Sequence, residues 1–177
     1  YMKFFAGKLK KYGVKSPAEL DDEKKKKFFN EIEKDWKHDS KEEVEVETIA
    51  KQYAKEGCNL IVFPESFVPG YPRGFSFGAT IGNRTDEGRQ HYADYYNNSF
   101  DLETDDLTRL ETLSKEQNSY IVIGVTEKQQ TNGSLYCSML YISPTKGLLG
   151  VHRKIKPTGT ERLIWAEAGA ESLVTFD

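Results

Sequence analysis

Residues 60–72 read LIVFPESFVPGYP. The first four form a short apolar run that is rich in β-branched and aromatic side chains and too short for a helix, and Pro64 closes it. One carboxylate, Glu65, follows at once, and the prolines and glycine after it favour a rigid loop. The pattern predicts a buried strand that delivers an acid to the edge of a sheet. The alternative is an ordinary surface glutamate at a strand end.

The composition fits a polar protein with a modest core. The chain has 177 residues, of which 37% are hydrophobic and 30% charged, and its net charge is −3. This length is enough for one domain with a core, or for one domain and a small appendage. The near-neutral charge gives no support to a nucleic-acid or membrane-surface role. No apolar stretch approaches the length of a membrane span, so no membrane partner is expected.

The N-terminus and the cysteines favour a reducing compartment. The first residues, YMKFFAGKLKKYG, carry lysines throughout and lack the apolar segment of a secretory signal. Two cysteines, Cys58 and Cys137, do not make a disulfide framework. We therefore expect a cytoplasmic protein, with both cysteines buried as small hydrophobic side chains.

The composition changes near residue 50, since every arginine follows that point and the first fifty residues use lysine as their cation. We expect residues 1–40 to form a lysine-rich segment of two short helices, with Gly13 ending the first and Asp21 or Asp22 starting the second. The residues 24–27, KKKK, are flanked by acids and are interpreted as a solvated helix face. The expected apolar faces comprise Phe5, Leu9 and Tyr12 in the first helix and Phe28, Phe29, Ile32 and Trp36 in the second.

From residue 41 to residue 177 the patterns predict one α/β domain. Expected helices cover 42–56, 86–97 and the region of Leu107, Leu110 and Leu113, and expected strands cover 60–63, 120–127, 135–142 and 148–154. Tight turns join the last three strands, which predicts antiparallel neighbours. The architecture is therefore a mixed sheet with flanking helices.

Four ionisable residues lie at predicted strand ends or in the loops just beyond them: Glu65, Glu127, Lys154 and Glu161. An acid and a lysine at one rim of a sheet suit a reaction that needs a base and a fixed cation. The alternative for Lys154 is a solvated strand end. The three histidines are scattered without ligand spacing, so no metal site is expected.

Several motifs, in order and with matching spacing over about residues 49–177, resemble the nitrilase branch of the carbon–nitrogen hydrolase superfamily. They are LIVFPESFVPGYPRG, IVIGVTE, LYCSMLYISPTKG and GVHRKIKPTGTERLIWAEA. Residues 1–40 carry no such resemblance. The resemblance implies that Glu65 is the general base, that Lys154 stabilises the tetrahedral intermediate, and that Glu161 is a supporting glutamate. Glu127 is a secondary candidate.

The resemblance also implies the chemistry. A cysteine thiolate attacks the carbon of a small nitrile or amide, ammonia leaves, and water hydrolyses the thioester to a carboxylic acid without a cofactor. The family's nucleophilic cysteine lies beyond TERLIW and past residue 177, so no nucleophile is expected in this chain. We therefore expect a truncated nitrilase-type hydrolase that is inactive as it stands. The alternative is a non-catalytic binding or structural module with a relic hydrolase portion, so whether the chain is an enzyme stays open.

The fold that the resemblance implies is an incomplete half of an α-β-β-α sandwich, preceded by the small helical segment. The family's first strand is expected where the lysine-rich segment stands. Strands of the missing half would cover one face of the present sheet, so we expect an exposed apolar surface. Its partner would be the missing C-terminal half or other copies of the chain in a homo-oligomer.

Overall fold

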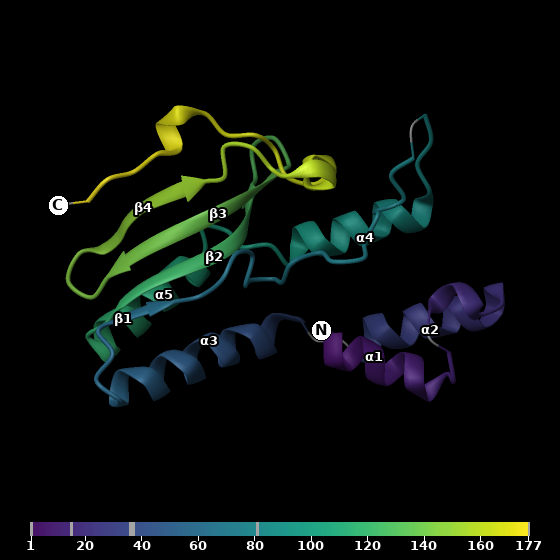
Figure 1. The fold of residues 1–177 in the computed structure, drawn as a ribbon, viewed down its shortest axis with the longest axis horizontal. Helices are drawn as coiled ribbons and strands as arrows, with labels where there is room; N and C mark the ends of the chain where they lie inside the picture. The colour runs from purple at the N-terminus through teal and green to yellow at the C-terminus, as the bar shows by residue number, and fades with distance from the viewer. Residues whose placement is uncertain (1, 15, 36–37, 81, 177) are drawn as a thin grey trace. The chain divides into compact units, whose positions relative to one another are not determined.

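The computed structural model describes residues 2–14, 16–35, 38–80 and 82–176 (Figure 1). The chain divides into two compact units, Tyr1–Lys41 and Glu42–Asp177. Within the described ranges, no helix combines the length and the apolar character that crossing a membrane requires.

The first unit contains two helices and a short 3₁₀ turn. They are α1 (Met2–Lys11), η1 (Pro17–Glu19) and α2 (Asp22–Asp35). Gly13, with φ of +69°, follows the end of α1 as predicted, because glycine adopts this left-handed conformation without strain. Asp21 precedes α2, and its carboxylate accepts a hydrogen bond of 2.8 Å from the Lys24 backbone N–H.

A buried aromatic contact and an ion pair hold the first unit together. Phe28 is fully buried and meets the Tyr12 ring edge-on, with ring centroids 5.2 Å apart. Lys11 Nζ donates to Glu31 at 2.8 Å, and this hydrogen bond is the largest cause that lowers the pKa of Glu31 to about 2. Four residues of the predicted apolar faces lie outside the described side chains: Phe5, Phe29, Ile32 and Trp36.

The second unit is a mixed four-stranded sheet with helices, which confirms the predicted α/β class. The strands lie in the order β1-β2-β3-β4, with β1 parallel to β2 and the other neighbours antiparallel. The elements are α3 (His38–Lys55), which begins before the boundary at Glu42, β1 (Leu60–Val62), α4 (Asp86–Asn97), α5 (Asp105–Gln117), β2 (Tyr120–Gln129), β3 (Ser134–Ser143), β4 (Gly147–Arg153), η2 (Gly159–Leu163) and η3 (Ala170–Ser172). The helix α3 begins at His38, four residues before the predicted start at residue 42.

The ends of α4 and α5 follow from local sequence. Thr85 precedes α4 and its hydroxyl accepts a hydrogen bond of 3.0 Å from the Gly88 N–H, a common N-cap contact. Asn118 ends α5 in the left-handed conformation, which asparagine tolerates better than most residues.

One face of the sheet is covered by α3 and α5. Alternate residues of β2, namely Ile121, Ile123 and Val125, are fully buried in one core cluster. The same cluster contains Val46 and Ala50 of α3, Leu110 and Leu113 of α5, and Leu140 and Ile142 of β3. The amphipathic helices and the alternating strands therefore bury their apolar sides against each other.

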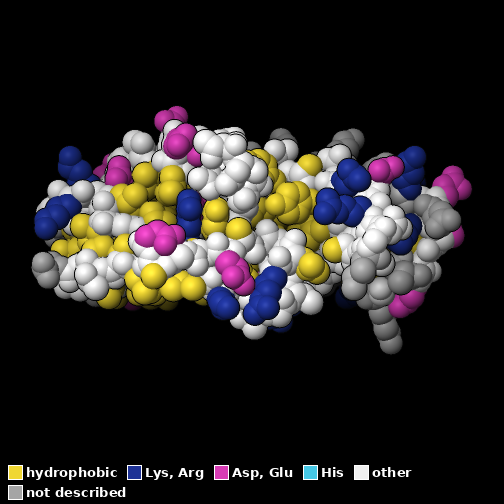
Figure 2. All heavy atoms as spheres, turned by 90° about the horizontal axis from the view of Figure 1, so that it is seen from above, with side chains coloured by type: hydrophobic (Ala, Val, Ile, Leu, Met, Phe, Trp, Pro, Cys, Tyr) yellow, Lys and Arg dark blue, Asp and Glu magenta, His cyan; other side chains and the backbone are white. Residues whose placement is uncertain are grey.

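The opposite face of the sheet is open at β1 and at the start of β2, whereas a second cluster of Leu135, Cys137 and Trp165 is buried further along it. In β1 and β2 the residues that alternate with the core are exposed: Leu60 by 54%, Val62 by 62% and Tyr120 by 46%. The C-terminal segment covers only part of this face, where the Phe176 ring lies 4.9 Å from the Tyr141 ring. Hydrophobic side chains gather at the surface in Figure 2. The predicted apolar surface is present in this unit.

Candidate active site

Glu65 lies in a loop that β2 holds in place. Phe63, only 3% exposed, anchors the end of β1, and the loop then returns along β2, where the Phe67 N–H donates to the Gly124 carbonyl at 2.8 Å. Position 124 requires glycine, because a Cβ there would lie 2.7 Å from Glu65 Cα and 2.8 Å from Ser66 N. This close approach presents the Glu65 carboxylate at the edge of the sheet, where its side chain is 46% exposed.

Lys154 follows β4 and joins two carboxylates. Its backbone N–H donates to the Cys137 carbonyl at 2.7 Å, which continues the pairing of β4 with β3. Its ammonium Nζ lies 2.9 Å from Glu65 Oε1 and 2.9 Å from Glu161 Oε2. Burial alone would lower the pKa of Lys154, but the hydrogen bonds to Glu161 and Glu65 raise it above the ordinary lysine value. Lys154 is therefore a fixed cation between two acids.

Glu161 is held by the turn in which it lies. It is the third residue of η2, where the Thr158 hydroxyl and the Glu161 carboxylate form a reciprocal capping box. The Thr158 N–H donates to Glu161 Oε2 at 2.6 Å, and Tyr71 Oη donates to Oε1 at 2.8 Å. Burial opposes ionisation, but these donors and Lys154 lower the pKa of Glu161 below its usual value. The acid is thus a carboxylate at neutral pH.

Tyr71 and Trp165 complete the surroundings of this cluster. Their rings meet edge-on with centroids 5.6 Å apart, and Lys154 Nζ lies 5.9 Å from the centroid of Trp165. Sequence reasoning did not select Tyr71 as a site residue. The available signal was an aromatic residue in a rigid Pro-Gly-Tyr-Pro loop directly after a candidate catalytic acid.

Glu127 lies on the other face of the sheet from this cluster. It lies on the same face of β2 as the core residues Ile121, Ile123 and Val125, is 2% exposed, and accepts hydrogen bonds from Ser138 Oγ at 2.7 Å and Arg153 Nε at 2.9 Å. A second Arg153 nitrogen also pairs with this carboxylate, and the guanidinium lies 4.0 Å from the centre of the Tyr136 ring. The structure therefore joins Glu65, Lys154 and Glu161, and places the secondary candidate in a separate buried ion pair.

Cys137 lies next to Glu65 yet is a poor nucleophile. It is buried, as predicted, and its Sγ lies 3.5 Å from Glu65 Oε1. Burial, together with the negative charge of Glu65, raises the pKa of the Cys137 thiol to about 12. The thiolate that attack on carbon requires is therefore scarce at neutral pH.

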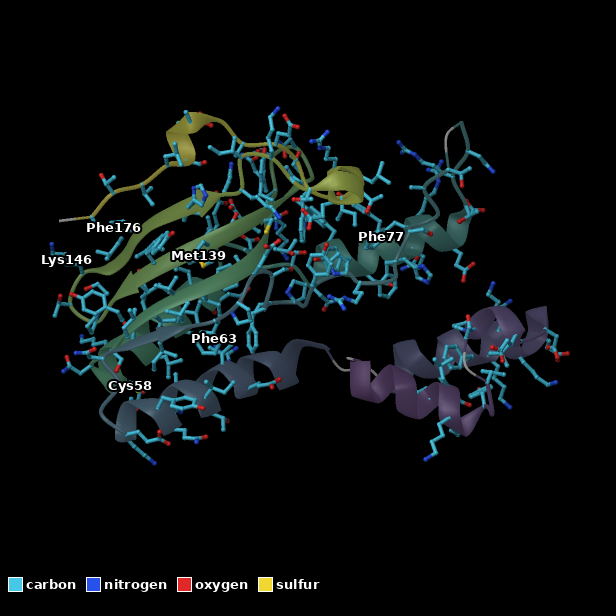
Figure 3. The ribbon with its side chains drawn as sticks, viewed as in Figure 1. Cys58, Phe63, Phe77, Met139, Lys146 and Phe176 are labelled. Carbon is cyan, nitrogen blue, oxygen red and sulfur yellow. The ribbon has the colours of Figure 1, made fainter. Side chains whose placement is uncertain are left out.

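Cys58 corrects one expectation, because it is exposed and not buried. It lies in the connection between α3 and β1, directly after Gly57, whose φ is +88° (Figure 3). A turn residue at the start of an edge strand has no facing element to bury it. Cys58 precedes β1 and Glu65 follows it, so the two residues lie at opposite ends of this strand.

The cluster offers a proton acceptor and a fixed positive charge at one point. The partly exposed carboxylate of Glu65 is accessible to a proton donor, and the ammonium of Lys154 is available to stabilise developing negative charge. Among the residues that the structure describes, no group of histidines, cysteines and acids is arranged to hold a metal ion.

The sequence matches the family described as carbon-nitrogen hydrolase over residues 36–176, which begins upstream of the expected start near residue 49. It is 42% identical over 127 residues to the aliphatic nitrilase of Sinorhizobium fredii (strain HH103), an alignment that covers 72% of this chain and 40% of that protein. It is 38% identical over 123 residues to the arylacetonitrilase of Trametes versicolor, covering 70% and 38% respectively. The chain thus spans about two fifths of the length of these curated relatives.

Among solved structures, the chain is similar to a carbon-nitrogen hydrolase from Helicobacter pylori G27. The TM-score is 0.48 with 18% sequence identity, and the match covers 73% of this chain and 40% of that one. The family match in sequence takes in every strand of the sheet together with Glu65, Lys154 and Glu161. This chain therefore belongs to the carbon–nitrogen hydrolase family.

Proposed function

We propose that this chain contributes the base and the cation of a nitrilase-type hydrolase that converts a small nitrile to a carboxylic acid and ammonia. Glu65 takes the proton of a cysteine thiol, and sulfur bonds to the nitrile carbon while the nitrogen is protonated. Addition of one water and departure of ammonia give a thioester. A second water then releases the acid and restores the thiol.

The observation that carries this proposal is the position of Lys154 Nζ, 2.9 Å from both Glu65 and Glu161. A cation fixed by two carboxylates needs little reorganisation when negative charge develops on the tetrahedral intermediate. Glu161 orients the lysine, and Glu65 remains exposed enough to accept a proton. No step in this sequence requires a metal or an organic cofactor.

The nucleophile is proposed to come from outside these 177 residues. Cys137 is buried and has a pKa of about 12, and Cys58 lies at the other end of β1 from Glu65. The chain alone is therefore expected to be inactive. The open apolar face, with Leu60 and Val62 exposed by more than half, supports a partner that covers it. We propose a C-terminal half of the family fold, or further copies of this chain, in that place.

A fusion tests the proposal. The 177 residues are joined to the part of the Sinorhizobium fredii aliphatic nitrilase that follows the aligned region, and ammonia release from a small nitrile is measured. The fusion should release ammonia and the unfused chain should not. Glu65→Gln should reduce the rate by about 10²–10⁴-fold, the usual contribution of a general base. Glu167→Gln, an exposed glutamate in the same segment as Glu161, is the matched control.

Two results would reject the catalytic role. One is a folded fusion with its cysteine in place that releases no ammonia. The other is a Glu65→Gln fusion as active as its parent. The relatives are named for aryl and for aliphatic nitriles, so the substrate panel includes one of each.

We retain a second proposal, a binding module with a relic hydrolase portion, because Tyr1–Lys41 forms a compact unit separate from the sheet-bearing unit. This proposal predicts that residues 1–40 alone retain a specific partner in a pull-down. Failure to retain one, together with an active fusion, would eliminate it.

A further inference from the structure

A short loop carries two residues of the cluster at its two ends. Glu65, at the start of residues 65–71, contacts Lys154, and Tyr71, at the end, donates to Glu161. The distance between the two ends of the loop therefore determines whether Glu65 can contact Lys154 while Tyr71 contacts Glu161. Any group that fixes the loop also fixes both contacts.

Three hydroxyl groups meet inside this loop. Ser66 Oγ lies 3.3 Å from the Gly70 carbonyl and 2.9 Å from Thr126 Oγ1 of β2. Tyr95 Oη of α4 lies 2.8 Å from the same Thr126 oxygen and 3.2 Å from the same Gly70 carbonyl. Ser66 is 1% exposed and Thr126 is fully buried. We call Ser66, Thr126 and Tyr95 the hydroxyl cluster.

The hydroxyl cluster acts on the two peptide units next to the site residues. Ser66 directly follows Glu65 and has φ of +48°, a conformation that costs a non-glycine residue about 1–3 kcal/mol and persists only where its surroundings hold it. Gly70 directly precedes Tyr71, and two hydroxyls converge on its carbonyl. These contacts therefore hold Ser66 and Gly70, near the two ends of the loop, close to each other.

Each hydroxyl of the cluster takes part in two of the four contacts, and only three hydroxyl protons are available for them. Loss of any one hydroxyl removes two of the four contacts. Burial raises the pKa of Tyr95 to about 12, so its hydroxyl keeps its proton and remains a donor at neutral pH.

We propose that Tyr95, acting through Thr126 and Ser66, is a positioning residue that holds Glu65 and Tyr71 against Lys154 and Glu161. The catalytic meaning of this role rests on the proposed function, but the positioning itself does not. The hydroxyl of a helix α4 residue thus determines the geometry of a site formed by the β1 loop and the segment after β4.

The test measures how far Lys154 is withheld from reaction. Only an unprotonated amine attacks acetic anhydride, so trace labelling at pH 8–9 followed by peptide mass spectrometry reports the free amine of each lysine. Lys146, exposed in the turn between β3 and β4 and labelled in Figure 3, serves as the internal reference. The measurement needs neither a substrate nor the missing nucleophile.

In the unmodified chain Lys154 should label far more slowly than Lys146. Tyr95→Phe should raise the relative rate of Lys154 by about three- to tenfold, which corresponds to half to one pKa unit lost when one of two carboxylates moves away. Tyr96→Phe is the matched control, because this second tyrosine of α4 also donates to a backbone carbonyl, that of Gln129 at 3.2 Å, but makes no contact with the loop among the described hydrogen bonds.

A second pair of variants keeps the test decisive if Tyr95→Phe does not fold. Thr126→Val removes the central hydroxyl at constant shape and should accelerate Lys154 labelling, whereas Thr126→Ser keeps the hydroxyl and should not. Equal labelling of Lys154 in Tyr95→Phe or Thr126→Val and in the unmodified chain would overturn the proposal. So would an equal increase in Tyr96→Phe, since that would indicate general loosening of the fold. A fusion without activity would reject the proposed function and leave the labelling result standing.

Discussion

Glu127→Gln should cost the second unit about 2–3 kcal/mol of stability without touching the Lys154 cluster. The Glu127 carboxylate is 2% exposed and accepts hydrogen bonds from Ser138 and from two nitrogens of Arg153. Glutamine replaces one acceptor oxygen by an NH₂ group that faces these donors, so at least one charge-assisted bond of about 1.5–3 kcal/mol is lost. Arg153 is 29% exposed, so water partly solvates it and the cost stays below the roughly 3–5 kcal/mol of a fully buried broken pair.

Urea unfolding followed by circular dichroism measures this change. With a urea dependence of about 1.5–2 kcal/mol per molar, the midpoint should fall by about 1–2 M. Glu116→Gln, an exposed glutamate on α5, should shift stability by less than about 0.5 kcal/mol. The double variant Glu127→Met with Arg153→Met should be more stable than Glu127→Gln, because apolar residues leave no unpaired charge. An unfolding midpoint for Glu127→Gln equal to that of Glu116→Gln would refute the reasoning.

Three other expectations follow from the second unit. Gly124→Ala should destabilise it by about 1–3 kcal/mol in the same urea assay, because the new Cβ collides with the backbone of the Glu65 loop. The pKa of Glu161 is lower in the folded than in the unfolded chain, so ionised Glu161 stabilises the fold above the unfolded-state pKa of about 4.3. This stabilisation is lost as the pH falls through the folded-state pKa. Glu161→Gln should therefore reduce the loss of folding stability between pH 6 and pH 3. The open sheet face should bind a hydrophobic dye and promote association in gel filtration, both reduced by Val62→Lys; a monodisperse monomer that binds no dye would contradict this.

The sheet and three members of the site were accessible from the sequence for the same reason. Strands β2, β3 and β4 have strong alternation or continuous apolar runs and are joined by tight turns, so local patterns specify their pairing. Glu65 and Lys154 lie at or just after strand ends, where parallel and antiparallel neighbours bring side chains to a common edge. The order of the motifs that resemble the nitrilase branch then assigned Glu161 to the same site. None of these inferences required knowledge of a loop conformation.

The remaining features depend on register and on loop geometry, which local patterns do not determine. Glu127 and Lys154 were both expected at strand ends, but β2 continues to Gln129, and the register that pairs Ser138 with Arg153 places the Glu127 ion pair on the helix-covered face. Tyr71 reaches Glu161 only because the intervening loop folds back, over a separation of 90 residues. Cys58 was wrongly expected to be buried because its residue type favours interiors, whereas its position in a turn leaves it exposed.

The two faces of the sheet have different roles, and the difference links folding to chemistry. The face with Ile121 and Ile123 is sealed by helices and contains the buried Glu127 pair. By strand alternation the other face carries Val62 and, further along, Cys137 and Lys154, so the exposed apolar residues and the candidate site share one surface. Whatever covers this surface must therefore pass beside Glu65 and Lys154. A nucleophile carried by that covering element would reach the base and the cation in the same step that buries the apolar face.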